Sequence, residues 1–190
     1  MSPRTEKQFL EIREERKAQI KKVALEIIYE EGLEGSSISK IANRAKISKG
    51  LLYNYYESKE HLIKEIVQDG IRPFVEIFDP NKDGILTVEE ARYFIDEMFH
   101  ILESNLKYWR LYFWVMIQPK VMALITDDFV KVIGPFMKIL LEYFKARGSD
   151  NPEVDMKIAL ALVDGICFHY LQDPHNFPLQ ETKERLYKFI

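Results

Sequence analysis

The chain has 190 residues, of which 47% are hydrophobic, so the composition supports a folded core and excludes a disordered chain. A single cysteine, Cys167, excludes a framework of internal disulfides, and no apolar run approaches the roughly 20 residues that a membrane span requires. The net charge of −3 divides into +3 over residues 1–64 and −6 over residues 65–190, which favours an N-terminal part that faces phosphate.

Helical periodicity dominates the N-terminal part, and no segment alternates with the period of a strand. A first helix carries apolar residues from Ile20 to Ile28 and is expected to stop at Gly32. The expected N-caps of the next three helices are serines: Ser36 or Ser37, then Ser48, then Ser58. We expect Gly70 and Pro73 to bend or end the fourth helix.

Five further helices are expected after a loop at residues 79–87. The first begins at a capping box formed by Thr87 and Glu90, and the second covers Leu106–Ile117. The third is a long helix that Asp127 caps, that Gly134-Pro135 kinks and that stops before Gly148. The fourth runs from Asn151-Pro152 to Leu171, and the last follows Pro178. The sequence therefore predicts an all-α protein of about nine helices. The last helical pattern runs to Ile190, so we expect that helix or the natural chain to continue.

The segment from residue 36 to residue 56 has the pattern of a helix-turn-helix, in which a first helix braces a second that lies in the DNA major groove. The bracing stripe is Ile38, Ile41, Ala42 and Ala45, with Ile47 in the turn. Leu52 and Tyr56 are expected to face inward from the short second helix. That arrangement leaves five residues available to DNA: Lys49, Gly50, Leu51, Tyr53 and Asn54.

The same segment resembles the tetracycline-repressor (TetR) family of bacterial regulators. The matching submotifs are Ser36-Ser37, Ile41-Ala42, Ser48-Lys49-Gly50, Leu52-Tyr53-x-Tyr55-Tyr56 and Ser58-Lys59-Glu60, in that order and at the family spacing. The resemblance covers roughly the first 65 residues. It implies a helix-turn-helix DNA-binding domain at residues 1–65, followed by an effector-binding and dimerisation domain at residues 66–190.

The resemblance also implies roles for individual residues and for partners. DNA contacts are expected from Ser36, Ser37, Arg44, Lys49, Gly50, Leu51, Tyr53, Asn54, Tyr55 and Lys59. Of these, Ser37, Lys49, Tyr53, Tyr55 and Lys59 would contact the DNA backbone, and Leu51 or Asn54 would determine specificity. The expected partners are a double-stranded operator with an inverted repeat, a small-molecule effector and a second copy of the chain.

One residue departs from the family pattern, which usually has glycine in the turn of the motif. This chain has Lys46 there. A lysine held at positive φ costs about 1 kcal/mol relative to glycine.

The C-terminal region is rich in aromatic residues and methionine between residues 94 and 144. Each of these side chains fits a helical core, and together they suit a pocket for an apolar or aromatic compound. The expected pocket residues are Phe94, Met98, Trp109, Phe113, Met116 and Phe136. For the last two helices, the family resemblance implies a four-helix dimer interface, and ordinary packing within one chain is the alternative. The expected interface residues are Ile158, Ala161, Leu162, Gly165, His169, Leu186 and Phe189.

Residues 79–90 match the pattern of an EF-hand calcium loop. The expected oxygen ligands are Asp79, Asn81, Asp83, the Ile85 carbonyl, Thr87 and Glu90, with Gly84 at the sharp turn. The alternative is a strong turn followed by a capping box, without any metal. EF-hand loops usually occur in pairs, and the sequence has no second loop of this pattern.

Three functions therefore compete. The first is a DNA-binding transcriptional regulator, expected to be a cytoplasmic repressor that a hydrophobic effector releases and that requires no cofactor. The second is a calcium-responsive regulator or calcium-binding module. The third, an enzyme, is disfavoured because the sequence has no nucleophile elbow, no metal-ligand histidine spacing and no phosphate-binding glycine loop. We therefore expect no catalytic residue. We also expect no membrane partner, since the charged N-terminus lacks the apolar stretch of a secretion signal.

Overall fold

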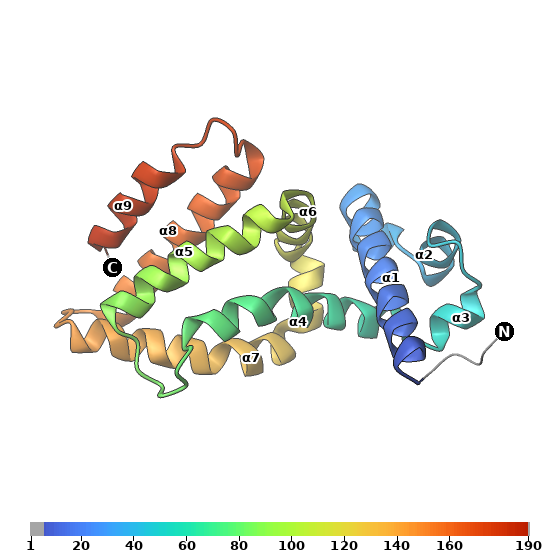
Figure 1. Cartoon of the computed structure of the whole chain (residues 1–190), viewed down its shortest axis with the longest axis horizontal. Coiled ribbons are helices and arrows are strands. Elements are labelled where there is room, and N and C mark those ends of the chain that lie inside the picture. The colour runs from blue at the N-terminus through green and yellow to red at the C-terminus, as the bar shows by residue number, and fades with distance from the viewer. Residues whose placement is uncertain (1–5, 190) are drawn as a thin grey trace. The chain divides into compact units, whose positions relative to one another are not determined.

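The computed structural model describes residues 6–189, and these form nine α-helices without a strand (Figure 1). The helices are α1 Glu6–Gly35, α2 Ile38–Arg44, α3 Lys49–Tyr53, α4 Lys59–Phe78, α5 Val88–Ser104, α6 Leu106–Met116, α7 Pro119–Ala146, α8 Pro152–Gln172 and α9 Leu179–Phe189. The prediction of an all-α chain with about nine helices is thus confirmed for the described residues. None of these helices is both long enough and apolar enough to cross a membrane.

The chain folds as two compact units. The first contains the described residues up to Val67 together with Trp114–Ile125, and the second contains Gln68–Phe113 and the described residues from Thr126 onward. The segment Trp114–Ile125, from the end of α6 into α7, thus belongs to the same unit as the N-terminal helices. Gln118 Nε2 donates to the carbonyl oxygen of Ile28 across 3.4 Å, and Lys120 forms an ion pair with Glu34.

Helix α1 is interrupted at Gly32, as the sequence predicts. Gly32 has φ 72° and ψ 172°, a conformation that an L side chain rarely adopts, and one more turn follows it to Gly35. Before the interruption, a stripe of buried residues from Ile20 to Ile28 forms the core of the first unit. The break therefore sets where the chain leaves α1 and enters α2.

The fourth helix does not end at Gly70 or Pro73, which was one of the two outcomes expected there, and the predicted start of the seventh helix is wrong. Helix α4 continues through Gly70 and Pro73 to Phe78, and α7 begins at Pro119, so that Asp127 lies inside the helix instead of capping it. Pro119 fits the first turn, where its missing N–H would have no helical partner. Gly70 serves packing, because a Cβ atom there would lie 2.2 Å from Cε2 of Tyr112.

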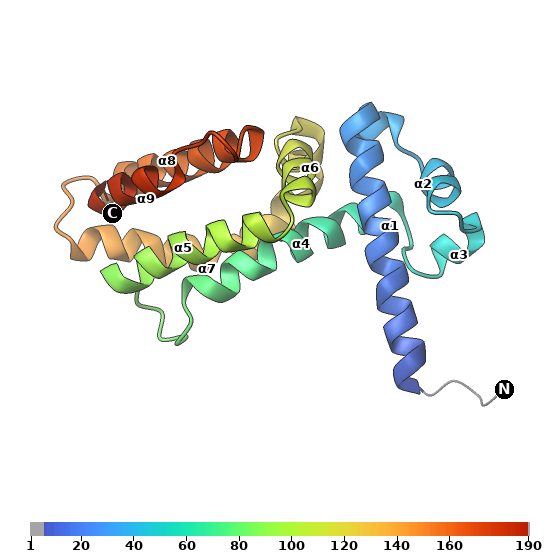
Figure 2. The same cartoon turned by 45° about the horizontal axis from the view of Figure 1, so that its top comes forward.

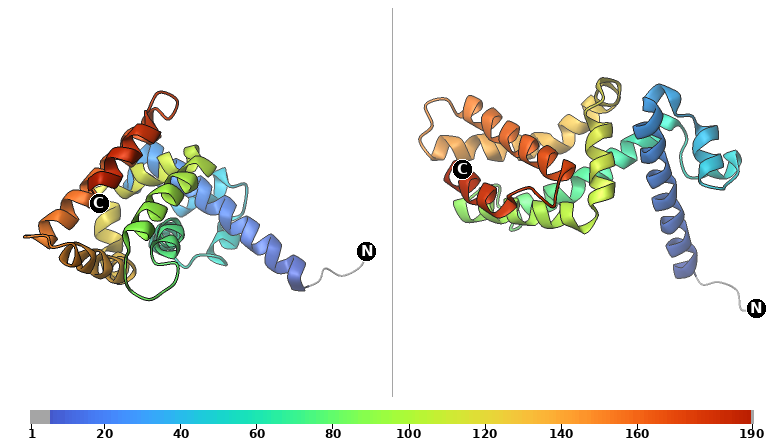
Figure 3. Two further views of the ribbon diagram at one scale, coloured as in Figure 1. Left: turned by 60° about the vertical axis from the view of Figure 1, so that its left-hand side comes forward. Right: turned by 90° about the horizontal axis from the view of Figure 1, so that it is seen from above.

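In the second unit, α9 packs against α5 (Figures 2 and 3). The contact is centred on Asp96 of α5, whose carboxylate pairs with Lys183 and accepts a hydrogen bond of 2.5 Å from the Tyr187 hydroxyl. Lys183 is buried although it is charged. Burial raises the pKa of Asp96, but the hydrogen bonds from Lys183 and Tyr187 outweigh it and hold this pKa below its usual value.

This lowered pKa predicts a pH-dependent contribution to stability. Asp96→Asn is expected to destabilise the protein at pH 7, where the native carboxylate is ionised. A carboxyl group whose pKa is lower in the folded protein than in the unfolded chain stabilises the fold at pH values above its ordinary pKa of 3.8. This contribution is lost as the pH falls through the pKa of the folded protein. Urea unfolding at pH 7 and at pH 3 measures the difference, which should shrink in acid. An equal difference at both pH values would contradict this assignment.

Candidate nucleic-acid interface

The second and third helices form a helix-turn-helix whose ends are fixed by serine side chains. Ser37 caps α2, since its Oγ accepts from the backbone N–H of Lys40 across 3.2 Å. Ser48 caps α3, since its Oγ accepts from the backbone N–H of Leu51 across 3.1 Å. The predicted cap at Ser58 is also present, with a 3.0 Å bond from the backbone N–H of His61.

The turn between the two helices has a left-handed residue. Lys46 has φ 56°, and the backbone N–H of Ile47 donates to the Ala42 carbonyl across 3.0 Å. Lysine has a Cβ atom that is crowded at positive φ, so this residue keeps the left-handed turn at a conformational cost. The side chain of Lys46 is exposed and gains nothing from burial.

Lys46→Gly is therefore expected to stabilise the protein by up to about 1 kcal/mol, since glycine adopts positive φ without steric cost. Urea unfolding followed by circular dichroism measures the change. Lys22→Gly is the matched control, because Lys22 is an exposed residue inside α1 where glycine should cost about 1 kcal/mol. Equal destabilisation by both exchanges would show that the left-handed turn carries no strain.

Helix α3 has one buried side and one exposed side. Leu52 and Tyr56 have no solvent exposure and anchor the helix to the core. The exposed side carries Lys49, Gly50, Leu51, Tyr53 and Asn54, the five residues that the sequence predicts to be available to DNA. A Cβ at Gly50 would meet no atom within 4 Å, so a DNA backbone can approach here closely.

Cationic groups lie beside the rings of Tyr53 and Tyr55. Lys49 Nζ lies 5.9 Å from the centroid of the Tyr53 ring, and the Arg13 guanidinium lies 5.1 Å from the Tyr55 ring. Arg13, on an exposed turn of α1, is a candidate contact that sequence reasoning missed. Its only sequence indication is that it precedes the apolar stripe of α1 within a basic run.

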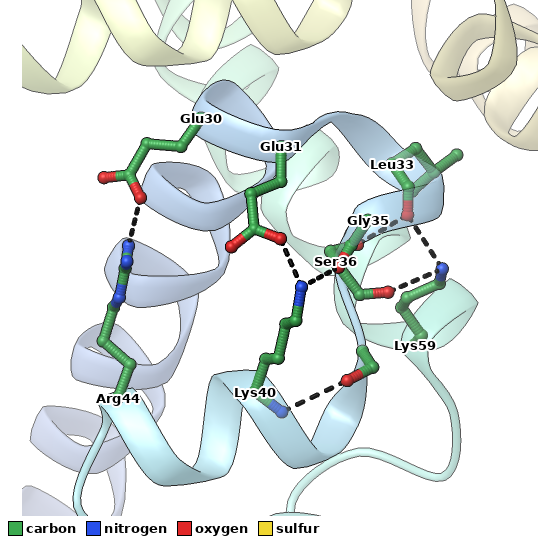
Figure 4. A network of polar contacts seen from close by, with 9 residues as sticks. Glu30, Glu31, Leu33, Gly35, Ser36, Lys40, Arg44 and Lys59 are labelled. Carbon is green, nitrogen blue, oxygen red and sulfur yellow. Dashed lines mark hydrogen bonds and ion pairs between the residues drawn. The ribbon is translucent and has the colours of Figure 1, made fainter.

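Two of the predicted DNA contacts face the protein instead of the exposed side (Figure 4). Ser36 is buried, and its hydroxyl donates to the Leu33 carbonyl across 2.7 Å. The Lys59 ammonium donates to the carbonyl oxygens of Leu33 and Ser36, across 2.9 and 3.2 Å. Both side chains therefore join the end of α1 to the helices that follow it, and any role toward phosphate is secondary to this contact.

The basic residues of α2 are paired within the unit (Figure 4). Arg44 Nη1 lies 2.7 Å from a carboxylate oxygen of Glu30, and Lys40 pairs with Glu31. These side chains are about half exposed, so the pairs contribute little to stability and can exchange for phosphate. Arg44 thus belongs to the motif, but its guanidinium is paired with Glu30 in this conformation.

A second set of cations is neutralised by one carboxylate. A carboxylate oxygen of Glu65 in α4 forms ion pairs with the Nζ atoms of Lys17, at 2.9 Å, and Lys21, at 3.0 Å. Burial raises the pKa of Glu65, but the hydrogen bonds from the two lysines outweigh it and lower the pKa below its usual value. The basic run of α1 therefore supports packing against α4, and less of it is available to DNA than the sequence suggests.

The second unit contains an apolar cavity of about 670 Å³, within the range of small-molecule sites. Side chains of α4, α5, α7 and α8 line the cavity, together with Leu86 and with Phe113 of α6. Phe78, Phe94 and Phe136 form part of its wall, with the rings of Phe78 and Phe136 centred 3.8 Å apart.

Four of the six predicted pocket residues line this cavity, namely Phe94, Met98, Phe113 and Phe136. The other two do not. Trp109 is buried outside the lining, where its indole N–H donates to the Ile101 carbonyl across 2.7 Å. Met116 belongs to the first unit. The helical pattern could not separate core residues from lining residues, because both are large and apolar.

Sequence reasoning also missed a polar residue in this cavity, Asp164 of α8. Burial raises the pKa of its carboxyl above the usual value. Its neighbour in the lining, Cys167, is almost completely buried, and burial together with the nearby Asp164 charge raises the pKa of the thiol to about 12. Cys167 is therefore an unreactive apolar lining residue at neutral pH.

Helix α8 is apolar on two sides. Leu160, Val163 and Cys167 face the cavity, whereas Ile158 and Leu162 are 43% and 40% exposed. Ala161 and His169 are also exposed, and Phe189 of α9 is 41% exposed. Of the predicted dimer residues, only Leu186 is buried within this chain.

The loop that resembles an EF-hand is held by its own hydrogen bonds. Asp79 Oδ2 accepts from the Gly84 N–H across 3.0 Å, and Asp83 Oδ1 accepts from the Ile85 N–H across 2.8 Å. Glu90 forms the predicted capping box with Thr87, whose N–H and hydroxyl both donate to Oε2 at 2.9 Å. Within residues 6–189, no three His, Cys, Asp or Glu side chains are grouped to hold a metal ion.

The calcium alternative therefore gains no support from the structure, whereas the capping box is present as predicted. We expect millimolar calcium to leave the melting temperature unchanged relative to the same concentration of magnesium. Differential scanning calorimetry after chelator treatment is the measurement. A calcium-specific rise that Glu90→Gln removes would instead establish the EF-hand site.

Comparison with known proteins points to gene regulation. Residues 20–66 match the family model described as bacterial regulatory proteins, tetR family. The HTH-type transcriptional regulator PksA of Bacillus subtilis is 23% identical over 184 residues, covering 93% of this chain and 87% of PksA.

Solved structures share the fold over nearly the whole chain. FadR of Bacillus subtilis, solved in complex with stearoyl-CoA, superposes with a TM-score of 0.68 at 19% identity, covering 90% of this chain and 95% of FadR. NalD of Pseudomonas aeruginosa, the secondary repressor of a multidrug efflux pump, gives a TM-score of 0.69 at 20% identity, with 92% and 94% covered.

Proposed function

Since the chain is a transcriptional regulator of the tetR family, we propose that it is a homodimeric repressor that a small apolar effector releases from its operator. Residues 1–65 would bind DNA, and residues 66–190 would bind the effector and form the dimer. The observation that carries the DNA-binding proposal is the exposed side of α3, where Lys49, Tyr53 and Asn54 surround the open position of Gly50.

The proposed DNA contacts divide into two kinds. Lys49, Tyr53 and Tyr55, with Ser37 at the start of α2, would bind phosphate and fix the position of the helix. Leu51 and Asn54 would read base edges, because both are exposed, Leu51 in the middle of α3 and Asn54 at its C-cap. Arg44 would reach DNA after release from Glu30, and Lys59 would act by holding the end of α1.

The exposed apolar side of α8 supports the proposal of a homodimer. Large apolar side chains grouped on an exposed side of a helix mark an interaction site, and the side that carries Ile158 and Leu162 has no cover within the described chain. A two-fold dimer would place two copies of α3 about 34–36 Å apart, so the operator should contain an inverted repeat. Leu162→Glu should yield a monomer by light scattering, whereas Glu153→Gln on an exposed position of the same helix should not.

The apolar cavity supports the effector proposal. Its lining suits a ligand with a large hydrophobic part, and the structurally similar FadR of Bacillus subtilis was solved with stearoyl-CoA. An effector that favours one conformation of the dimer would lower DNA affinity by about 5- to 150-fold, the usual range of such coupling.

Selection of bound duplexes from a random pool, followed by gel shifts over a salt series, tests the DNA-binding proposal. We expect an enriched inverted repeat and an affinity that falls steeply with salt, since each neutralised phosphate adds about 0.9 to the log–log slope. Recovery of no enriched sequence, together with salt-independent binding, would refute the proposal.

A further inference from the structure

The first three turns of α1 extend past α2 and α3, the helices of the motif (Figures 2 and 3). Residues 6–15 are all exposed, and the first buried residue of the helix is Ile20. The exposed residues include large apolar side chains, since Phe9 is 57% and Leu10 is 62% exposed. This overhang, residues 6–16, therefore contributes no buried residue to the core of the first unit.

The overhang has two chemically different sides. Helical residues return to the same side at intervals of four and three positions, so Phe9, Arg13 and Arg16 continue the side of α1 that is buried further along. By the same spacing, Glu11 and Glu15 lie on the opposite side of the helix. The basic and apolar side of the overhang therefore has the same orientation as the side of α1 that packs in the first unit.

The two arginines lie toward the motif and have no carboxylate partner. The Arg13 guanidinium lies 5.1 Å from the ring centroid of Tyr55, which follows α3 and is a proposed phosphate contact. Arg16 donates to the neutral amide oxygen of Gln19 across 2.7 Å. No ion pair with a carboxylate engages either arginine within residues 6–189, in contrast to Arg44. Their charges are therefore not neutralised by the folded unit.

We propose that the overhang is a second DNA-binding element, which lies along the duplex beside the groove that α3 occupies. This inference rests on the proposed DNA-binding function and adds an element to it. Arg13 and Arg16 bind phosphate oxygens, and Phe9 and Leu10 pack against the sugars at the edge of the groove. Glu6, at the tip, is the one acidic residue on this side of residues 6–16.

Charge selects the duplex instead of an apolar protein surface as the occupant of this side. An arginine that is buried against apolar atoms without a partner is costly, whereas a phosphate group neutralises it and accepts its hydrogen bonds. The acidic side of the overhang, with Glu11 and Glu15, then faces away from the duplex, where it does not repel the phosphates.

The double variant Arg13→Ala with Arg16→Ala tests the charged contact. Fluorescence anisotropy with a random-sequence duplex over a salt series should show an affinity about tenfold lower and a log–log slope smaller by about 2 for each bound protomer. Lys7→Ala with Lys22→Ala is the matched control, because it removes the same charge from the other side of the helix and should leave the slope unchanged. The melting temperature should stay the same in both, since none of these residues is buried.

The apolar contact is tested separately by Phe9→Ala with Leu10→Ala. This change should lower the affinity about fivefold through lost apolar contact. The salt slope should not change, because neither side chain neutralises a phosphate. A fall in slope equal to that of the arginine variant would show that the whole overhang had been displaced, and the assigned apolar contact would be wrong.

The position of the overhang on DNA is measured by cleavage from an iron chelate attached at Phe9→Cys. The native Cys167 is buried and unreactive, so the new cysteine takes the label. We expect cuts in the DNA backbone next to the positions that α3 protects. The same label at Glu11→Cys, on the opposite side of the helix, should cut less.

The possible failures are distinguishable. If the unmodified protein shows no salt-dependent DNA binding, the proposed function itself fails. If it binds DNA but the arginine variant keeps both affinity and slope, or if the label at Phe9→Cys makes no cut, the function stands and the inferred second element is wrong. If Phe9→Ala with Leu10→Ala lowers the molecular mass in light scattering and leaves DNA affinity unchanged, the overhang contacts another copy of the chain, which also overturns the inference.

Discussion

Gly70→Ala is expected to destabilise the protein by about 2 kcal/mol, although alanine usually stabilises a helix. The exchange gains about 1 kcal/mol in helix propensity. Against this gain stands a steric clash, since the added Cβ would lie 2.2 to 2.8 Å from three ring carbons of Tyr112. Tyr112 is buried and packs against Trp109, so its ring cannot move without disturbing its neighbours. Overpacking of this kind costs about 3 kcal/mol.

Thermal unfolding should show this loss as a fall of roughly 4–8 °C in melting temperature. Gly50→Ala is the matched control, because it makes the same exchange in α3 where a Cβ meets no atom within 4 Å. That control should be neutral or slightly stabilising. In a Tyr112→Ala background the ring is absent, so Gly70→Ala should then stabilise, and persistent destabilisation there would exclude the clash as the cause.

The helical architecture was predictable because the information that determines it is local. Serine caps, the glycine interruption of α1 and the capping box at Thr87 act within a few residues, and each is present in the structure. The continuation of α4 past Gly70 has a cause that is not local. A glycine that makes room for a side chain 42 positions later along the chain has the same sequence pattern as a glycine that ends a helix.

The candidate DNA interface was predictable in part, for the same reason. The exposed side of α3 follows from its period and its caps, whereas the engagement of Lys59 with Leu33 and Ser36 depends on how α4 meets the end of α1. The place of Asp164 in the cavity lining was not predictable either. A lone carboxylate on α8 resembles any solvated surface residue until the cavity beside it is known.

The double variant Lys49→Ala with Tyr53→Ala is expected to lower DNA affinity by about 100-fold without lowering stability. The two side chains are exposed on α3 and lie together, with the Lys49 ammonium 5.9 Å from the centroid of the Tyr53 ring. Each is proposed to bind phosphate, and a contact of this strength contributes about 1–3 kcal/mol. Because neither side chain contributes to the core, the melting temperature should stay within about 1 °C.

The salt dependence identifies the mechanism of this loss. Removing Lys49 removes one cation from the interface, so the log–log slope of affinity against salt should decrease by about 1. Lys131→Ala removes the same charge from an exposed position on α7 in the second unit and should leave both affinity and slope unchanged. Fluorescence anisotropy with a random-sequence duplex measures both quantities. Tyr53→Phe then separates the hydroxyl from the ring, since retention of full affinity would assign the contact to the aromatic face alone. If the double variant kept the original slope, α3 would not be the element that meets the DNA backbone, and the paired arginine of α2, Arg44, would become the next residue to replace.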